Sequence, residues 1–213
     1  MNGLVKRILL LICGFMIVGI SIGMMKFLNL GIDPFGVMLQ GISDLSGLSF
    51  GTLVMIAQII LFIPVVLKRR DLIGIGTIVG IFGIGYIIEF FGIMWHNLIQ
   101  VELTLPIKIV ILVISLIVLA FGAALNIVAN LGVVVYDALH LVVEDVTIKK
   151  ISFKWSRMGC DAICTIAGFL LGATVGIATL ATVFMIGPFI TYFKTKLGNI
   201  LNLNGEFAKQ GSN

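Results

Sequence analysis

Two short stretches of this sequence place ionisable and helix-breaking residues inside apolar surroundings. The first is 29–36, in which Asp33 precedes Pro34. The second is 130–137, which repeats the opening Asn-Leu-Gly of the first and ends on Asp137. Proline cannot donate the backbone bond that continues a helix, and glycine tolerates backbone shapes that other residues resist. A pair of helix breaks in an apolar chain is the best sequence indication of a transport site.

Each break is expected to start a short helix, near Phe35 in the first stretch and near Tyr136 in the second. A helix N-terminus presents unpaired N–H groups and partial positive charge, which suits an anionic group on a solute. Asp33 and Asp137 stand at the same places, and either could instead cap its own helix. The sequence leaves both interpretations open.

Two further pairs of ionisable residues are spaced to share a helix face. His140 lies one turn after Asp137, so the two could touch and move a proton in a coupled carrier, or the histidine could be satisfied by hydrogen bonds alone. Arg157 and Asp161 lie one turn apart in a later apolar segment. We expect a salt bridge that faces the bundle, and it would bind a charged solute, open as a gate, or only neutralise two charges.

Amide side chains flank both breaks. They could satisfy freed backbone groups or bind a solute, with the structural role favoured. Together with the residues of the breaks, the predicted substrate-binding residues are Asn29, Asp33, Pro34, Gly36, Gln40, Asn126, Asn130, Asp137, His140, Arg157 and Asp161.

Other chemistry is not indicated. The sequence has no nucleophile elbow, zinc-protease motif, Walker loop or dinucleotide fingerprint, so we expect no catalytic residues, no cofactor and no enzymatic activity. Cys160 and Cys164 share a helix face, but a lone thiol pair without histidine is a poor metal site, and no metal is expected. The net charge of +4 is explained by positive loops on the cytoplasmic side rather than by nucleic-acid binding.

The composition predicts an all-α integral membrane protein. Apolar residues make up 60% of the 213 residues and charged residues 11%, and the mean hydropathy is +1.20. Two apolar segments, 35–45 and 136–143, are too short to cross a bilayer at 1.5 Å per residue. The remaining segments are long enough for full spans and cover 8–28, 50–67, 72–94, 106–129, 153–172 and 175–193.

The two halves of the chain read as copies of one unit. Phe35 corresponds to Tyr136 and Asp44 to Asp145 at the same offset, and the stretch 74–77 matches 176–179. A duplicated unit is the economical explanation. We therefore divide the chain into a first membrane repeat (1–94), an extracytoplasmic loop (95–105), a second membrane repeat (106–193) and a cytoplasmic tail (194–213).

Basic residues indicate the orientation of the repeats. With the N-terminus in the cytoplasm and both short segments re-entrant, the basic clusters at 6–7, 68–70 and 149–157 all face inward, and only Lys26 and Lys108 lie outside. If all eight segments crossed, the cluster at 68–70 would lie outside. We therefore favour an arrangement with two inverted repeats, about six transmembrane helices, two re-entrant half-helices and cytoplasmic termini. The alternative is an arrangement in which all eight segments cross.

Three motifs carry a family resemblance. The stretches 30–36 (Leu-Gly-Ile-Asp-Pro-Phe-Gly), 46–52 (Ser-Gly-Leu-Ser-Phe-Gly-Thr) and 74–77 resemble the YczE/YyaS group of bacterial membrane proteins, which is related to the YitT-like proteins. The resemblance extends to about Phe193, although Val135 stands in the second repeat where the first has Pro34. It implies a multi-pass protein of the bacterial inner membrane, in a group that resembles transporters.

These observations lead to two hypotheses of different classes. The first is a secondary transporter or channel for a small polar or charged metabolite, in which Asp33, Asp137 and Arg157 line a water-accessible cavity between the repeats. The second is a membrane accessory or scaffold protein with a closed interior. An enzyme acting on lipid is a weaker third. The expected partners are the lipid bilayer and an unidentified small-molecule solute, a homo-oligomer is compatible with the sequence, and no nucleic acid is expected.

Overall fold

The computed structural model describes residues 3–148, 150–151 and 153–200, with the side chains of 153 and 154 excluded, and this part of the chain contains helices and no strand. In chain order the elements are α1 (Gly3–Leu28), α2 (Pro34–Ser46), α3 (Phe50–Lys68), the 3₁₀-helix η1 (Arg70–Leu72), α4 (Ile75–Val79), the π-helix η2 (Gly80–Ile84), α5 (Gly85–Leu98), α6 (Leu105–Ala129), α7 (Val135–Val146), α8 (Phe153–Leu170) and α9 (Ile177–Ile200).

Five helical stretches in the described residues are long and apolar enough to cross a membrane, rather than the six expected. They are α1, α3, the continuous stretch from α4 to α5, α6 and α9. α8 has 18 residues, but Lys154, Arg157 and Asp161 reduce its apolar character. The protein is therefore a multi-pass helical membrane protein.

Two helices extend beyond their expected ends. α5 continues through Trp95 to Leu98, so the connection to α6 is shorter than the predicted loop 95–105. α9 continues to Ile200, and the rest of the predicted tail lies outside the described residues. A helix can extend into interfacial residues at no cost because its backbone bonds remain satisfied there.

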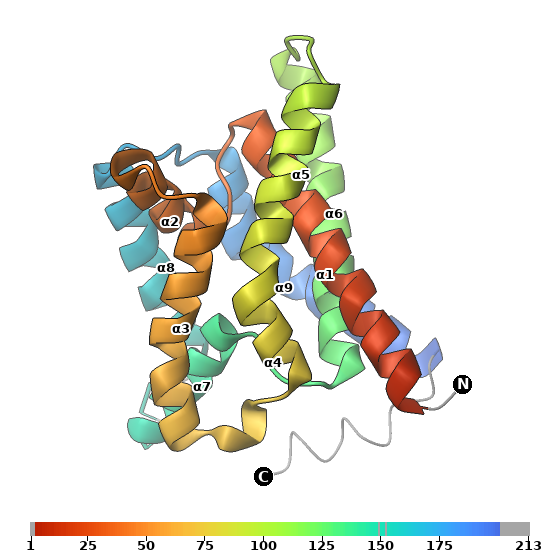
Figure 1. Ribbon diagram of the computed structural model, residues 1–213, viewed down its shortest axis with the longest axis vertical. Coiled ribbons are helices and arrows are strands. Elements are labelled where there is room, and N and C mark those ends of the chain that lie inside the picture. Colours follow the sequence, from red (N-terminus) through yellow and green to blue (C-terminus); the bar gives the residue numbers. More distant parts are fainter. Residues whose placement is uncertain (1–2, 149, 152, 201–213) are drawn as a thin grey trace.

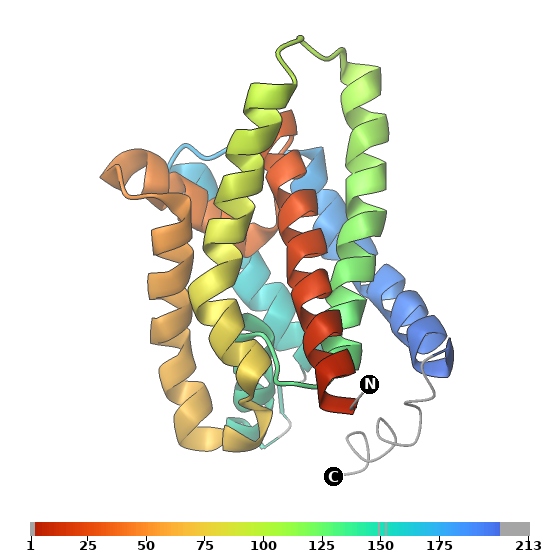
Figure 2. The same ribbon diagram turned by 45° about the vertical axis from the view of Figure 1, so that its right-hand side comes forward.

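α1 and α6 pack extensively against each other. α1 packs against both α6 and α5, and α6 packs in turn against α9, as Figures 1 and 2 show. Small residues allow the close crossing of α1 and α6: a Cβ atom on Gly14 would lie 3.0 Å from the carbonyl oxygen of Gly122, and one on Gly122 would lie 3.1 Å from that of Gly14.

Both predicted helix breaks are present. α1 ends at Leu28 and α2 begins at Pro34, while α6 ends at Ala129 and α7 begins at Val135. The short helices α2 and α7 lie toward opposite ends of the bundle (Figure 1). They also pack crosswise, because α2 contacts α8 of the second half and α7 contacts α3 of the first half.

The irregular backbone of each break is bonded to the other half of the chain. The carbonyl of Leu30 accepts the N–H of Ala178 at 3.0 Å, and the carbonyl of Leu131 accepts the N–H of Gly76 at 2.7 Å. One bond therefore pairs the first break with the first turn of α9, and the other pairs the second break with the first turn of α4. Lipid offers no partners to free backbone groups, so these bonds make the breaks tolerable at this depth.

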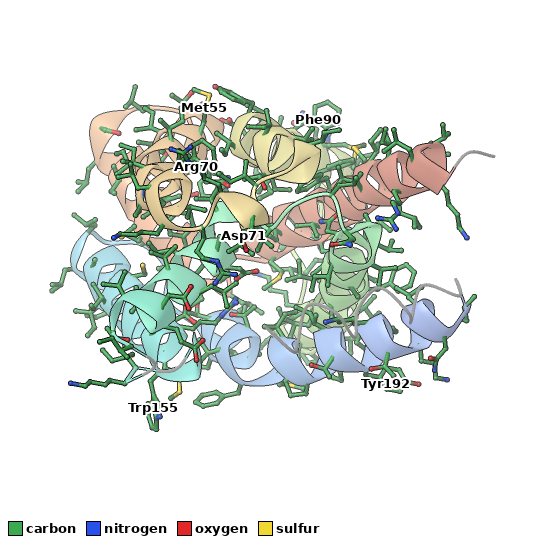
Figure 3. All side chains as sticks on the ribbon, turned by 90° about the horizontal axis from the view of Figure 1, so that it is seen from below. Met55, Arg70, Asp71, Phe90, Trp155 and Tyr192 are labelled. Atoms are coloured by element: carbon green, nitrogen blue, oxygen red, sulfur yellow. The ribbon has the colours of Figure 1, made fainter. Side chains whose placement is uncertain are left out.

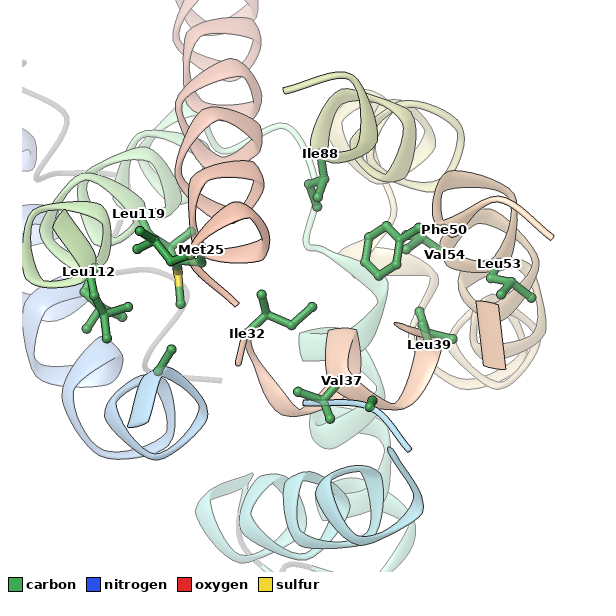
Figure 4. Close-up of a cluster of buried hydrophobic side chains, with 14 residues drawn as sticks. Met25, Ile32, Val37, Leu39, Phe50, Leu53, Val54, Ile88, Leu112 and Leu119 are labelled. Atoms are coloured by element: carbon green, nitrogen blue, oxygen red, sulfur yellow. The ribbon is translucent and has the colours of Figure 1, made fainter. Parts of the chain in front are cut away.

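The largest apolar cluster surrounds the first break. Ile32 from the break and Val37 and Leu39 from α2 pack with Phe50 of α3 and Met25 of α1, and all five are at most 4% exposed (Figure 4). The apolar face of α2 therefore holds this helix in place, and the first turn of α2 points toward the bundle interior.

The fourth segment of the first half contains a π-helical stretch, η2. Such a stretch displaces one backbone bond from the regular helical pattern. Gln58 of α3, which is 3% exposed, donates its Nε2 to the carbonyl of Gly80 at 3.2 Å. This segment approaches α3 closely at Gly85, where a Cβ would lie 2.8 Å from the carbonyl oxygen of Gly51.

An ionic contact joins the two halves at the end of the bundle that holds η1. Arg69 donates to Asp145 at the end of α7 at 2.5 Å and to Asp71 of η1 at 2.9 Å. The hydrogen bond from Arg69 holds the pKa of the Asp71 carboxyl below its usual range. The bonds to both carboxylates raise the pKa of the Arg69 guanidinium.

We expect Gly132→Ala to destabilise the protein by about 1–3 kcal/mol, because the backbone at Gly132 has a φ of +115°. The added Cβ would also lie 2.6 Å from the amide nitrogen of Gly74. Gly159→Ala in α8 is the matched control, since its Cβ meets nothing within 4 Å. Thermal unfolding in detergent measures both variants. Equal melting temperatures would contradict the proposed strain.

The ion pair at Arg69 predicts a modest loss of stability in acid. The folded-state pKa of Asp71 is depressed, so its contribution is fully present above the unfolded value of about 4 and is lost as the pH falls below that value. Asp71 is 61% exposed, so the contribution is about 0.2–1 kcal/mol. Asp71→Asn should remove this part of the pH dependence. An unchanged melting curve from about pH 5 to about pH 3 in both proteins would contradict it.

Candidate functional site

The two half-helices meet at their N-terminal ends. Phe35 in the first turn of α2 stacks on Tyr136 in the first turn of α7, with ring centroids 4.7 Å apart and planes inclined by 28°. These residues occupy equivalent positions in the two halves of the sequence. The two breaks therefore face each other, and an aromatic stack fills the meeting point.

Ionisable side chains of α7 and α8 surround this stack. Tyr136 donates its hydroxyl to Asp161 at 2.7 Å, and Arg157 donates Nη1 to Asp137 at 2.5 Å. The expected pair of Arg157 and Asp161 is present but longer, with Nε and Oδ2 3.8 Å apart. Arg157 is therefore held between two carboxylates and bonds more closely to the one on α7.

The two aspartates of the breaks have different roles. Asp33 accepts the N–H of Gly36 at 3.0 Å and caps α2, in which Pro34 takes a first-turn position. Asp137 does not cap α7: the cap position is Val134, which offers no side-chain bond, and the carboxylate binds Arg157 instead. The capping interpretation is correct for Asp33 and wrong for Asp137, because Asp137 lies one turn too far along its helix.

His140 is fully buried one turn below the stack. Its Nδ1 lies 3.1 Å from the hydroxyl oxygen of Ser156, and its ring meets Tyr136 edge-on at 4.8 Å. Asp137 and Arg157 lie within electrostatic reach of the imidazole. We define the central cluster as Asp33, Phe35, Tyr136, Asp137, His140, Ser156, Arg157 and Asp161.

A pocket of about 210 Å³, the Asn29 pocket, lies beside the first break. Thr174 donates to Asn29 at 3.0 Å, and Gln40 donates to Asp44 at 2.6 Å, so two polar pairs line it. Lys26 adds a cationic group, and its ammonium lies 3.6 Å from the centre of the Phe50 ring.

A second pocket of about 410 Å³, the Asn130 pocket, lies beside the second break. Asn126, Asn130, Asp71 and Asp137 supply its polar groups, and the backbone of 130–134 forms one wall. Asp71 lies near the middle of the bundle when it is seen from below, whereas Trp155 points outward (Figure 3).

Nine of the eleven predicted site residues thus fall into three places, while Pro34 and Gly36 lie in the first turn of α2. Asn29 and Gln40 line the Asn29 pocket, Asn126 and Asn130 line the Asn130 pocket, and Asp137 lines the Asn130 pocket and belongs to the central cluster. Asp33 and Arg157 line neither of these pockets. Neither of these two pockets is lined by Asp33, Asp137 and Arg157 together, so the single cavity expected between the repeats stays a prediction, and the aromatic stack occupies the place where the breaks meet.

Sequence reasoning missed several members of the site. Phe35 and Tyr136 were recognised as equivalent positions but not as contacting residues, and a matched aromatic pair at the start of two facing half-helices is the pattern that identifies them. Lys26, Ser156 and Thr174 gave no pattern of their own. In the described residues, no three His, Cys, Asp or Glu side chains converge as ligands for a metal ion.

Comparison with known proteins identifies a family and a relative of this chain. Residues 5–195 match the model of a family of unknown function, DUF6198. The chain is 29% identical over 182 residues to the protein YyaS of Bacillus subtilis (strain 168), an alignment that covers 84% of this chain and 88% of the relative. No solved structure matches the chain significantly. The resemblance to the YyaS group is confirmed, and the chain belongs to the family DUF6198.

Proposed function

We propose that this protein is a secondary transporter or channel for a small polar or charged metabolite. Two half-helices that meet head to head, with a polar pocket beside each break, are the observation that supports this function. The solute path would run from the Asn29 pocket, past the central cluster, to the Asn130 pocket. The Phe35–Tyr136 stack would close it in the described conformation.

We infer that the two halves are inverted repeats with six crossings. The crosswise packing of α2 on α8 and of α7 on α3 supports a two-fold relation, as do the equivalent bonds of Leu30 and Leu131. α8 would be the sixth crossing. The side chains of Arg157 and Asp161 bond to residues of α7, so they are directed into the protein and need not face lipid.

We place the end of the bundle that holds η1 in the cytoplasm of a bacterial cell, with both termini on the same side. The N-terminal end of α1 and η1 lie at the same end of the bundle (Figure 1), and basic residues are concentrated at both. The Asn130 pocket would then open to the cytoplasm and the Asn29 pocket to the outside. Lipid and the solute would be the partners, and no catalysis is proposed.

Arg157 would be the residue that responds to the solute. It holds Asp137 at 2.5 Å and Asp161 at 3.8 Å, so a charged group entering the central cluster would compete for one of these partners. A partner exchange of this kind would change the contact of α8 with α7 and loosen the closure at Tyr136.

Uptake into proteoliposomes tests the function. A panel of small cationic, anionic and zwitterionic metabolites would be compared for wild type, Asp33→Asn, Arg157→Gln and the loop control Glu102→Gln. Loss of the short ion pair between Arg157 and Asp137 is expected to lower the initial rate for Arg157→Gln at least about tenfold. Asp33→Asn should also lower it, although asparagine still caps α2.

The control Glu102→Gln should transport at the wild-type rate, since Glu102 is exposed between α5 and α6. No protein-dependent flux for any solute class would reject transport and favour the accessory or scaffold function. Flux that is equal in wild type and Arg157→Gln would reject the central cluster as its path.

Cysteine labelling tests the number of crossings. In a variant whose native cysteines are replaced by alanine, a membrane-impermeant maleimide would be applied to Thr174→Cys and Ile73→Cys. These residues line the Asn29 and Asn130 pockets. Six crossings place them on opposite sides, so Thr174→Cys should label only in right-side-out vesicles and Ile73→Cys only in inside-out vesicles. Labelling of both from one side would indicate eight crossings.

A further inference from the structure

The Asn29 pocket brings side chains of both charges to one cavity. Lys26 near the end of α1 and Asp44 in the last turn of α2 both line it, together with the uncharged polar residues Asn29, Gln40 and Thr174. The Asn130 pocket differs, because its lining in the described part of the chain includes carboxylates but no lysine or arginine. The Asn29 pocket can therefore accept a negative and a positive group of one solute.

Lys26 supplies a positive charge that is not neutralised by a direct ion pair. Its ammonium lies 3.6 Å from the centre of the Phe50 ring, and within residues 3–148 and 153–200 no carboxylate lies within 4.0 Å of it. Asp44 and Glu89 are in electrostatic reach only, and Glu89 accepts the N–H of Gly51 at 3.0 Å. An aromatic face offsets only part of the cost of a partly buried ammonium, so Lys26 can take an anionic partner from solution.

Gln40 supplies an unused hydrogen-bond acceptor. Its Nε2 donates to Oδ1 of Asp44 at 2.6 Å, and its Oε1 is buried without a hydrogen-bond partner among the described residues. A buried carbonyl oxygen that lacks a donor is destabilising, and an N–H group of a solute would satisfy it. Because the Asp44 carboxylate is bonded to the same amide, these two acceptors of α2 together suit an ammonium group, which carries three donors.

The volume and the apolar lining of the pocket limit the size of the solute. At about 30 Å³ per water molecule, the volume of about 210 Å³ holds about seven waters, or a solute of about seven non-hydrogen atoms. Met25, Ile32 and Val37 supply apolar lining, so a small apolar group on the solute is also tolerated (Figure 4). Small α-amino acids have this size and carry one carboxylate and one ammonium group.

We propose that the Asn29 pocket is a binding site for a small zwitterion of the α-amino acid class. The carboxylate of the solute pairs with Lys26, and its ammonium group bonds to Oε1 of Gln40 and to the carboxylate of Asp44. The solute thereby bridges two opposite charges that do not form a direct ion pair in the described conformation. The site names the solute class of the proposed transport function and rests on it for its biological role, whereas binding can be measured without transport.

Binding of radiolabelled glycine, L-alanine and L-serine to the purified protein in detergent tests the solute class. Wild type should bind at least one of them. Unlabelled analogues that lack either the ammonium group or the carboxylate of the tightest binder, which for L-alanine are propionate and ethylamine, should compete at least about tenfold more weakly, since each loses a bond between charged groups. Failure of all three amino acids to bind overturns the proposal, and so does an analogue that competes equally well.

Substitutions in the pocket test the contacts. Lys26→Gln and Asp44→Asn should each weaken binding at least about tenfold, and Asp44→Asn keeps an acceptor for Gln40. Lys108→Gln is the matched control, because Lys108 lies in the first turn of α6 and lines neither pocket. Its affinity should equal that of wild type. Wild-type affinity in both Lys26→Gln and Asp44→Asn would place the bound amino acid elsewhere and overturn the proposal.

Protection from labelling locates the solute without disturbing either charge. The amino acid that binds should slow the reaction of Thr174→Cys with the maleimide several-fold and leave that of Ile73→Cys unchanged, since the two residues line different pockets. Equal rates for Thr174→Cys with and without the amino acid would contradict binding in the Asn29 pocket.

Comparison of binding with flux separates this site from the transport function. Amino-acid binding in the Asn29 pocket without protein-dependent flux retains the site and rejects transport. Flux of another solute class, with none of the three amino acids bound, rejects the site and retains transport.

Discussion

Inside a lipid bilayer, every backbone polar group must find its hydrogen-bond partner within the protein, and this requirement governs the structure. The two breaks interrupt helical bonding, and each recovers a partner from the opposite half, the first break from α9 and the second from α4. Glycine is needed where this happens, because Gly31 and Gly132 adopt φ values of +94° and +115° and lie against Gly176 and Gly74. The halves are therefore interlocked through their irregular segments.

This interlocking determines where the polar chemistry lies. The first turns of α2 and α7 face each other, because Phe35 of α2 stacks on Tyr136 of α7. α8 runs beside both half-helices, and its Arg157 and Asp161 reach the same place. Polar groups that would be costly next to lipid are thereby collected inside the bundle, with a pocket beside each break.

Much of the fold could be predicted from the sequence, because helix breaks and apolar length are local properties. The breaks before Pro34 and Val135 and the duplicated pattern were visible in the residues themselves. The ion-pair partner of Arg157 could not be predicted in this way. The one-turn spacing indicates Asp161, whereas the tertiary fold brings Asp137 closer to Arg157. Likewise, the pockets depend on the position of the breaks within the bundle. Residue spacing does not determine that position.

The bond between Leu30 and Ala178 links a residue of the first break to one near the end of the chain. During synthesis the first break therefore enters the bilayer long before its partner exists. Until α9 is inserted, the exposed carbonyl must rely on water, lipid headgroups or the translocation machinery, and α2 has no finished α8 to rest on. Assembly is completed only by the final helix, so a chain truncated before α9 should be recognised as unfinished and degraded.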